Sequence, residues 1–262
     1  MKMSVSNIAW DKSNDEFMLH YLADNNIQGL EVAPTRLIES YPYDNLDIAI
    51  QTKDYIKKKF NLSISSIQSI WYGRKENIFR DENEYNILLN YTKKAIKFAE
   101  AVECPNIVFG CPRNRNIEDY NKLGIASRFF KEIGDYAKDR NTIIALEPNP
   151  VIYNTNFINT TLEAFEFVKM VNSDGVMVNV DLGTILYNNE NLSDIFAEIE
   201  FINHIHISEP NLLQIEKRDI HMELSKILKK TDYNKYISLE MKNYNDLKIL
   251  TNSIKYVNEV IV

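Results

Sequence analysis

The chain alternates short apolar runs with longer segments of mixed polarity. The runs are rich in isoleucine, valine and other residues that favour buried strands. We predict eight strands from them, at residues 3–9, 27–33, 62–70, 105–110, 142–147, 176–181, 202–208 and 235–241. The third is ambiguous, because serine alternates with apolar residues along it.

The segments between these runs carry apolar residues at helical spacing. The segment 81–103, for example, opens with acidic side chains that suit a helix N-terminus and then repeats apolar residues at that spacing. Helices are predicted at about residues 13–25, 44–60, 81–103, 117–140, 160–172, 191–200, 219–230 and 245–260. Eight strands, each followed by a helix, predict an α/β protein of the (β/α)8 TIM-barrel class.

A doubly wound parallel sheet is the competing α/β architecture, and it predicts a glycine-rich phosphate loop after the first strand. The residues that follow the first strand here are WDKSNDE, which contain no glycine. No linker rich in proline, glycine or serine and no low-complexity tract interrupts the alternation. We therefore expect a single TIM-barrel domain over residues 1–262.

Composition and charge indicate a soluble globular protein and argue against membrane-spanning and nucleic-acid-binding classes. The 262 residues are 45% hydrophobic and 26% charged, as in ordinary soluble globular proteins, and no apolar run approaches the length of a membrane span. The formal net charge of −7 argues against broad binding to a nucleic-acid backbone. The first residues, MKMSVSNIAWDKSND, become polar too early for a secretory signal.

The two cysteines, Cys104 and Cys111, flank the predicted strand PNIVFG. An extended strand would hold their Cα atoms roughly 23 Å apart, whereas a disulfide needs a separation below about 7 Å. We expect two free thiols, which favour a reducing, cytoplasmic location.

The active site of a TIM barrel lies at the C-terminal ends of its strands, so the residues found there indicate function. Strands five, six, seven and eight carry at these ends, in that order, Glu147, Asp181, His206 and Glu240. Because neighbouring strands lie about 4.8 Å apart, these side chains can converge on one divalent ion. An oxygen-rich site with one imidazole suits Mn²⁺ or Mg²⁺, and Co²⁺ and Zn²⁺ are also compatible.

Each of these residues also has an ordinary structural explanation. Carboxylates at strand ends are commonly solvated or cap a helix. Asp181 could be a turn residue, and Glu240 could pair with Lys242. Four such residues on four successive strands, each at the end of an apolar run, favour the metal site.

The chain has four histidines, and two of them lie one residue apart in HIHISEP. His204 and His206 share one face of the predicted strand. His206 is nearer the C-terminal rim and is the predicted ligand, whereas His204 is expected to have a structural role in the barrel interior. His20 and His221 fall on predicted helices, where we expect surface or capping positions.

Further residues at the predicted rim are candidates for substrate binding. Trp10 and Trp71 could stack on the apolar face of a sugar or could equally pack into the rim. Polar candidates for bonds to hydroxyl groups, or for the pocket wall, are Glu31, Gln68, Asn149 and Tyr153.

Six motifs, taken in order, resemble the xylose-isomerase-like TIM barrels. They are GLEVAPTR, IVFGCPRNR, ALEPNP, NVDLGT, HIHISEP and SLEMK. This superfamily holds sugar and sugar-phosphate isomerases and epimerases, inosose dehydratases and isomerases, and endonuclease-IV-like enzymes. The resemblance implies metal ligation by Glu147, Asp181, His206 and Glu240. As in its ketose 3-epimerase members, it also implies proton transfer by Glu147 and Glu240.

The chain departs from the epimerase members at two positions. Three residues after Asp181, where they often carry a histidine, stands Thr184. Six residues after His206, where they place an arginine, stands Leu212. Both family residues usually touch substrate.

The loop GCPRNR follows the fourth strand and opens on the same rim. Arg113 and Arg115 alternate, so one of them is expected to face the pocket. The family's loop of this shape ends in an arginine turned toward the site, which implies that Arg115 binds an anionic or highly hydroxylated part of the substrate. The alternative is that both arginines form ion pairs with Glu118 or Asp119.

These observations lead to one principal hypothesis. The protein is expected to be a divalent-metal-dependent isomerase or epimerase of a sugar, sugar phosphate or related polyhydroxy carbonyl compound, with carboxylates moving a proton through a metal-stabilised enediolate. The alternatives are a metal-dependent dehydratase of a polyol or keto acid, an endonuclease-IV-like phosphoesterase, and a non-catalytic sugar-binding barrel. The expected partner is a small sugar or sugar derivative. We expect no binding to nucleic acid or membrane. The sequence does not decide between a monomer and a homodimer.

Overall fold

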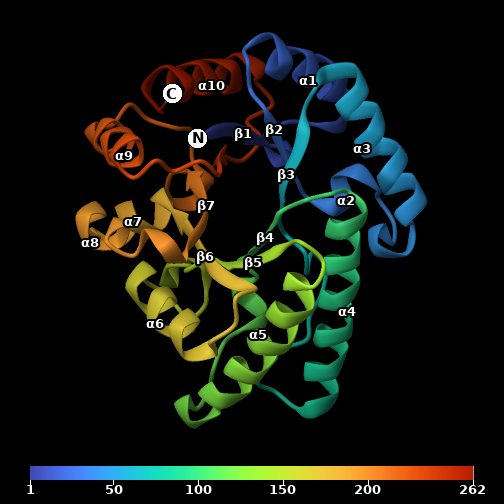
Figure 1. Cartoon of the computed structure of the whole chain (residues 1–262), viewed down its shortest axis with the longest axis vertical. Coiled ribbons are helices and arrows are strands. Elements are labelled where there is room, and N and C mark those ends of the chain that lie inside the picture. The colour runs from blue at the N-terminus through green and yellow to red at the C-terminus, as the bar shows by residue number, and fades with distance from the viewer. Residues whose placement is uncertain (262) are drawn as a thin grey trace.

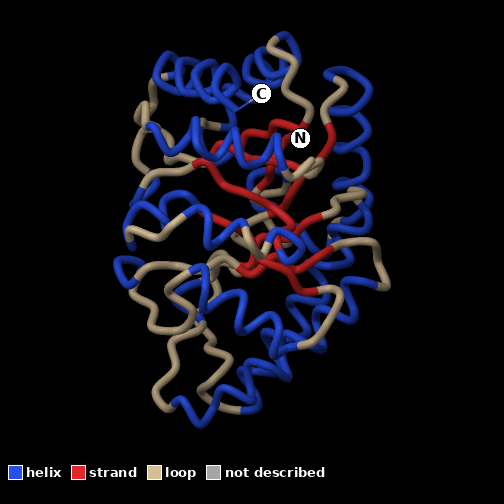
Figure 2. Tube along the Cα trace, turned by 60° about the vertical axis from the view of Figure 1, so that its left-hand side comes forward, coloured by secondary structure: helices blue, strands red, loops and turns tan. Residues whose placement is uncertain are grey.

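Eight parallel strands close into a barrel at the centre of the molecule (Figures 1 and 2). The computed structural model describes residues 1–261. The strands pair in sequence order, and β1 closes the ring by pairing with β8. Their bounds are β1 Lys2–Ser6, β2 Gly29–Val32, β3 Ser63–Ile67, β4 Asn106–Phe109, β5 Ile143–Leu146, β6 Val176–Asp181, β7 Ile202–Ile207 and β8 Tyr236–Leu239. The predicted TIM barrel is confirmed.

Helices form an outer layer around the barrel, which the coiled ribbons of Figure 1 show. They are α1 Asp15–Asp24, α2 Pro34–Leu37, α3 Leu46–Phe60, α4 Glu82–Ala101, α5 Leu123–Lys138, α6 Thr161–Val171, α7 Leu182–Asn188, α8 Leu192–Phe196, α9 Asp219–Lys230 and α10 Leu247–Ile261. In α4, the buried residues recur every three or four positions, and the Asp81 side chain accepts a bond from the Glu84 N–H at the N-terminus. This helix therefore begins and packs as its sequence pattern predicts.

The helices after β4 and β6 differ from the prediction. α5 begins at Leu123 rather than at residue 117, because the backbone of Ile117 bonds to the side chain of Asn156 instead of continuing a helix. After β6, the short helix α7 was not predicted. It starts without a connecting loop, since Asp181 both ends the strand and caps the helix.

The register of the strands brings the C-terminal ends of β5 to β8 to similar heights along the barrel axis. Asp181 pairs with His206 across β6 and β7, and His206 pairs with Ser238 across β7 and β8. β5 and β8 are shorter than predicted, so Glu147 and Glu240 each follow the last strand residue directly. The C-terminal rim thus receives all four residues of the predicted metal site.

Both cysteines are free, as predicted, and Cys104 is buried. None of the helices in the described part of the chain combines the length and the apolar character that a membrane crossing requires.

Candidate metal centre

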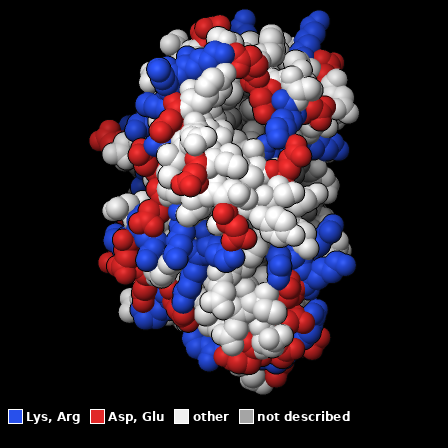
Figure 3. All heavy atoms as spheres, turned by 90° about the vertical axis from the view of Figure 1, so that its right-hand side faces the viewer, with Lys and Arg blue, Asp and Glu red and all other residues white. Residues whose placement is uncertain are grey.

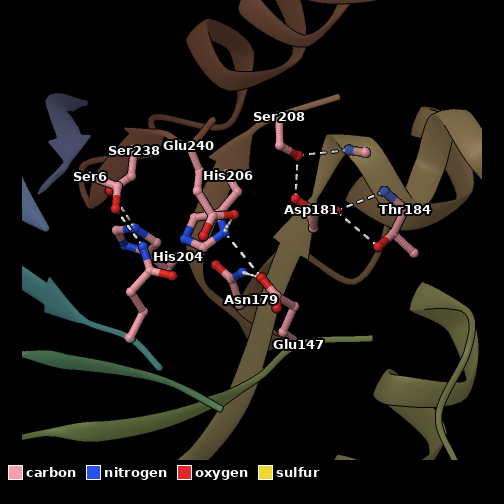
Figure 4. A network of polar contacts seen from close by, with 12 residues as sticks. Ser6, Glu147, Asn179, Asp181, Thr184, His204, His206, Ser208, Ser238 and Glu240 are labelled. Carbon is pink, nitrogen blue, oxygen red and sulfur yellow. Dashed lines mark hydrogen bonds and ion pairs between the residues drawn. The ribbon is translucent and has the colours of Figure 1, made fainter. Parts of the chain in front are cut away.

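Glu147, Asp181, His206 and Glu240 converge at the C-terminal rim of the barrel (Figure 4). Each offers one nitrogen or oxygen atom, and these four atoms all lie within 4.8 Å of one another. The Nδ1 atom of His206 is 3.0 Å from Glu147 Oε1 and 3.1 Å from Glu240 Oε2. Four side chains from four successive strand ends therefore face one common point.

The surroundings of His206 Nδ1 indicate whether a cation could bind between the four side chains. His206 is fully buried, and within the described residues its Nδ1 atom has no hydrogen-bond partner despite the two nearby carboxylates. A buried nitrogen without a hydrogen bond is costly unless another group compensates it. A divalent ion held between this nitrogen and the carboxylates would do so, and the mixed oxygen and nitrogen donors suit the ions predicted from the sequence.

The opposite side of the His206 ring fixes its tautomer. Nε2 lies 3.0 Å from Glu31 Oε2, where its N–H can donate to the carboxylate. With one proton held on Nε2, the loss of the second proton leaves Nδ1 with a lone pair that points to the rim. Ligating histidines in metal sites are commonly oriented in this way. Burial opposes a charge on this imidazole, but Glu31 and Glu240 raise the pKa of His206 well above its ordinary value.

His204 lies deeper in the barrel and has different partners. It is buried, and its Nε2 atom is 2.8 Å from Ser238 Oγ and 3.2 Å from Glu31 Oε2. Burial, the largest effect, lowers the pKa of His204. These contacts fit the predicted structural role.

Asp181 combines the ligand position with the cap of α7. Its Oδ2 atom accepts bonds from the backbone N–H and the hydroxyl group of Thr184, at 2.7 and 2.9 Å, and Oδ1 accepts from Ser208 (Figure 4). The ordinary explanation as a cap and the metal hypothesis are thus compatible, because a carboxylate oxygen has more than one lone pair. Burial, and then the charge of Glu147, raise the pKa of Asp181 to about 6.

Two amides hold the carboxylate of Glu147. Asn179 donates to Oε1 at 2.7 Å, and Asn149 donates to Oε2 at 3.1 Å. Gly110 leaves room for it, since a Cβ atom there would lie 2.7 Å from Oε2. We did not single out Asn179 from the sequence, although it precedes Asp181 by two residues and therefore shares its face of the strand.

Glu240 is less restrained and more affected by its surroundings. It is 7% exposed, and burial raises its pKa to about 7, although His206 acts in the opposite direction. Three carboxyl groups crowd into this space, and His206 is the basic side chain whose ring nitrogen lies 3.0 and 3.1 Å from two of them. A divalent ion would remove the repulsion among them.

A cavity of about 190 Å³ opens above the cluster. Three of the proposed ligands and three of the predicted substrate-binding residues line it: Glu147, Asp181, Glu240, Gln68, Asn149 and Tyr153. The structure thus brings Gln68, Asn149 and Tyr153 to the site that the sequence predicted for them.

Other predicted substrate residues lie behind the cavity wall. Glu31 and Arg115 have no exposed surface, and Trp10 is 2% exposed. Trp10 donates from its indole N–H to Asp15 at 2.8 Å, and Trp71 is buried against Phe109 and Phe129. For Trp10 and Trp71, this burial fits the alternative that they pack into the rim. Glu31 and Arg115 present no surface that a substrate could touch in this structure, because strand-end position alone does not reveal depth.

Arg115 supports the wall instead of lining it. One amino group of its guanidinium donates to the Glu147 carbonyl and to Asn149 Oδ1, both at 2.7 Å. Burial lowers its pKa to about 10. Arg113 is exposed, and among the described residues neither arginine forms an ion pair with Glu118 or Asp119. The alternative based on those ion pairs is therefore not supported either.

The two remaining histidines lie on helices outside the barrel, His20 on α1 and His221 on α9. His20 is exposed on α1, as predicted. His221 is 1% exposed, and its Nδ1 atom lies 2.9 Å from the hydroxyl oxygen of Tyr256. The expectation of a surface or capping position for His221 was wrong, because the inner face of α9 packs against α10.

Sequence comparison bears directly on this architecture. Residues 19–260 match the family profile described as "Xylose isomerase-like TIM barrel". The chain belongs to this family. A comparison with curated protein sequences gave no match.

Solved structures agree in fold over almost the entire chain. The apo 3-keto-D-glucoside 4-epimerase of E. coli has a TM-score of 0.79 and 17% identity, covering 99% of both chains. The D-psicose 3-epimerase of Clostridium cellulolyticum H10, solved with D-tagatose, has a TM-score of 0.82 and 15% identity, covering 100% of this chain and 99% of its own. The IolI protein with a bound zinc atom has a TM-score of 0.76 and 16% identity, covering 100% and 98%.

Proposed function

We propose that the protein is a divalent-metal-dependent isomerase or epimerase of a sugar or a related polyhydroxy carbonyl compound. The observation that carries this proposal is the pair Glu147 and Glu240, whose carboxylate oxygens lie 3.0 and 3.1 Å from His206 Nδ1. Both carboxylates also line the cavity. Two carboxylates that reach one small polar cavity can serve as the base and acid of a proton transfer.

Glu147, Asp181, His206 and Glu240 would hold the ion. When bound, a divalent ion would act as a Lewis acid that polarises a substrate carbonyl group and acidifies the adjacent C–H bond. The amides of Asn149 and Asn179 hold the Glu147 carboxylate in one position, which suits a base that must meet a C–H bond of the substrate. Glu240 has no comparable amide contact among the described residues, which suits a group that gains and returns a proton.

The position at which the proton returns would decide the reaction. Return to the neighbouring carbon gives an isomer, and return to the opposite face of the same carbon gives an epimer. Loss of a β-hydroxyl group would make the protein a dehydratase instead. The cavity contains Gln68 and Tyr153 as partners for hydroxyl groups, which supports a polyhydroxy substrate.

The phosphoesterase alternative has less support. Lys and Arg lie among Asp and Glu on the face that Figure 3 shows, without one continuous basic surface there. The cluster at the rim contains one histidine. A second group of neighbouring metal-capable side chains, Glu31, His204 and His206, lies deeper in the barrel, where His204 contacts Ser238 and Glu31. A binding barrel without catalysis would not require two carboxylates beside the same His206 nitrogen.

A screen in D₂O tests the proposal. The purified protein, stripped of metal and resupplied with Mn²⁺ or Mg²⁺, would be incubated with free sugars, sugar phosphates and inososes. Deuterium entering a C–H bond next to the carbonyl group, only in the presence of the ion, is the expected result. Formation of a conjugated product with loss of water would instead identify a dehydratase. No exchange with any compound in the panel would contradict the proposal.

A further inference from the structure

We infer that the part of the substrate held in the catalytic cavity is uncharged, so that the protein acts on neutral polyhydroxy carbonyl compounds and not on their phosphate esters or acids. This inference rests on the proposed function and narrows its substrate class. It is carried by the charges and polarity of the cavity wall.

The described residues that line the cavity include carboxylates but no cationic side chain. The charged residues among its described lining are Glu147, Asp181 and Glu240. Even with a divalent ion bound, three ionised carboxylates leave the lining side chains with a net negative charge. The buried Arg115 places a cation behind the wall, next to Asn149, but presents no surface to the cavity. An anionic substrate group would enter a small cavity, lose much of its hydration and face these carboxylates.

The cations closest to the cavity in sequence are directed elsewhere. Arg115 is fully buried, and its hydrogen bonds go to the Glu147 carbonyl and to Asn149. The ammonium group of Lys242 lies over the ring of Tyr244, 5.2 Å from its centroid. Arg113 is exposed and does not belong to the cavity lining.

Uncharged side chains provide the rest of the wall. Leu212, Ile8 and Pro112 are apolar, while Gln68 and Asn149 offer amide groups that suit hydroxyl groups. The Tyr153 hydroxyl group accepts a bond from the Asn211 N–H at 2.9 Å, which fixes it beside the same loop. Both the amides and the apolar surfaces match the two kinds of surface on a neutral sugar.

The size of the cavity points in the same direction. Its volume of about 190 Å³ is below the roughly 300–1,000 Å³ of common ligand pockets. A small neutral molecule would fill it. A phosphorylated one would extend beyond this volume, and the described lining offers no cationic partner for its phosphate group.

Matched pairs of compounds test the inference. Metal-loaded protein would be given free ketoses, aldoses and inososes, together with their monophosphates and with sugar acids that keep the aldehyde or ketone group, in D₂O. We expect kcat/KM for deuterium exchange to be at least about tenfold higher for a neutral compound than for its charged partner. A phosphate or acid that exchanges as fast as, or faster than, its neutral partner would overturn the inference and leave the proposed function intact. Absence of exchange with every compound would contradict both.

Two leucines provide a matched pair of variants. Leu212 lines the cavity, whereas its neighbour Leu213 is 45% exposed and lies outside it. Leu212→Lys would place a cation at the wall and is expected to shift the preference toward phosphorylated compounds by about tenfold or more. Leu213→Lys should leave the preference unchanged. An equal effect of the two variants, or no effect of Leu212→Lys, would show that wall charge does not select the substrate.

Discussion

The carboxylate of Glu31 lies 3.0 Å from His206 Nε2, on the side of the imidazole that faces away from the other proposed ligands. Glu31 is fully buried and also contacts His204 and Gln68, each at 3.2 Å. The nearby histidines, His206 most strongly, outweigh burial and lower the pKa of Glu31. An ionised carboxylate at this place would hold the proton on Nε2 and make Nδ1 a better ligand.

We therefore predict that Glu31→Gln weakens metal binding about 10- to 100-fold, although Glu31 does not face the ion. Isothermal titration with Mn²⁺ would measure the change. Glu209→Gln is a matched control, because Glu209 is another buried glutamate, whose partner is Arg218 at 2.7 Å. Equal Mn²⁺ affinities of Glu31→Gln and the wild-type protein would show that Glu31 does not orient the ligand.

The two histidines of HIHISEP should respond differently to the same substitution. His206→Gln removes the proposed nitrogen ligand, so bound metal should be lost. His204→Gln breaks a buried contact with Ser238 and should lower the free energy of unfolding by about 1–3 kcal/mol while metal stays bound. Metal content by elemental analysis and urea denaturation would distinguish the two. Retention of metal by His206→Gln, with its loss from His204→Gln, would reverse the assignment.

Glu147→Gln and Glu240→Gln should each abolish turnover, even where some metal stays bound. Either change keeps the shape of the side chain but removes the carboxylate that carries the proton. Deuterium exchange would be measured together with metal content. Glu223→Gln, on the exposed face of α9, is the control and should exchange normally. Full activity in either rim variant would remove that carboxylate from the proposed mechanism.

A methyl group at Gly110 should reduce activity through Glu147. The Cβ atom of Gly110→Ala would lie 2.7 Å from Glu147 Oε2, so the carboxylate must move. A displacement approaching 1 Å can cost on the order of 100-fold in rate. Gly124→Ala is the comparison, because nothing lies within 4 Å of its added Cβ atom. If kcat is the same in both variants, the position of Glu147 is not critical.

The raised carboxyl pKa values predict opposite pH trends for stability and metal binding. In the metal-free folded protein, Asp181 has a pKa of about 6 and Glu240 of about 7, above the roughly 4 of unfolded carboxyl groups. Such groups bind more protons in the folded state than in the unfolded state. Their contribution to the free energy of unfolding therefore falls as the pH rises from about 4 to about 7. The pKa of His206 is also raised, so its contribution to stability likewise falls as the pH rises above about 6.5.

A divalent ion requires deprotonated ligands, so its affinity should rise over the same interval. Urea midpoints at about pH 5 and about pH 7, with EDTA or with Mn²⁺, would test this linkage. We expect the stabilisation by Mn²⁺ to grow with pH. A stabilisation that shrinks between these two pH values would contradict the proposed ligands.

The sequence predicted the barrel and its rim better than the depth of individual side chains. Apolar runs are visible because buried strands need them, and Glu147 and Glu240 stand out because each ends such a run. Sequence position does not show whether a residue near a strand end turns into the cavity or beneath it. Glu31 and Arg115 lie beneath, and their roles depend on partners from distant strands and loops.

The four proposed ligands all lie after residue 146, in the second half of the chain, whereas Glu31 lies near its beginning. Glu31 and His206 are 175 residues apart and meet only when the ring of strands has closed. Contacts between residues so far apart in the sequence form slowly during folding. During refolding, tight metal binding should therefore appear only after the two halves have joined, and a metal-sensitive signal would record barrel closure in time.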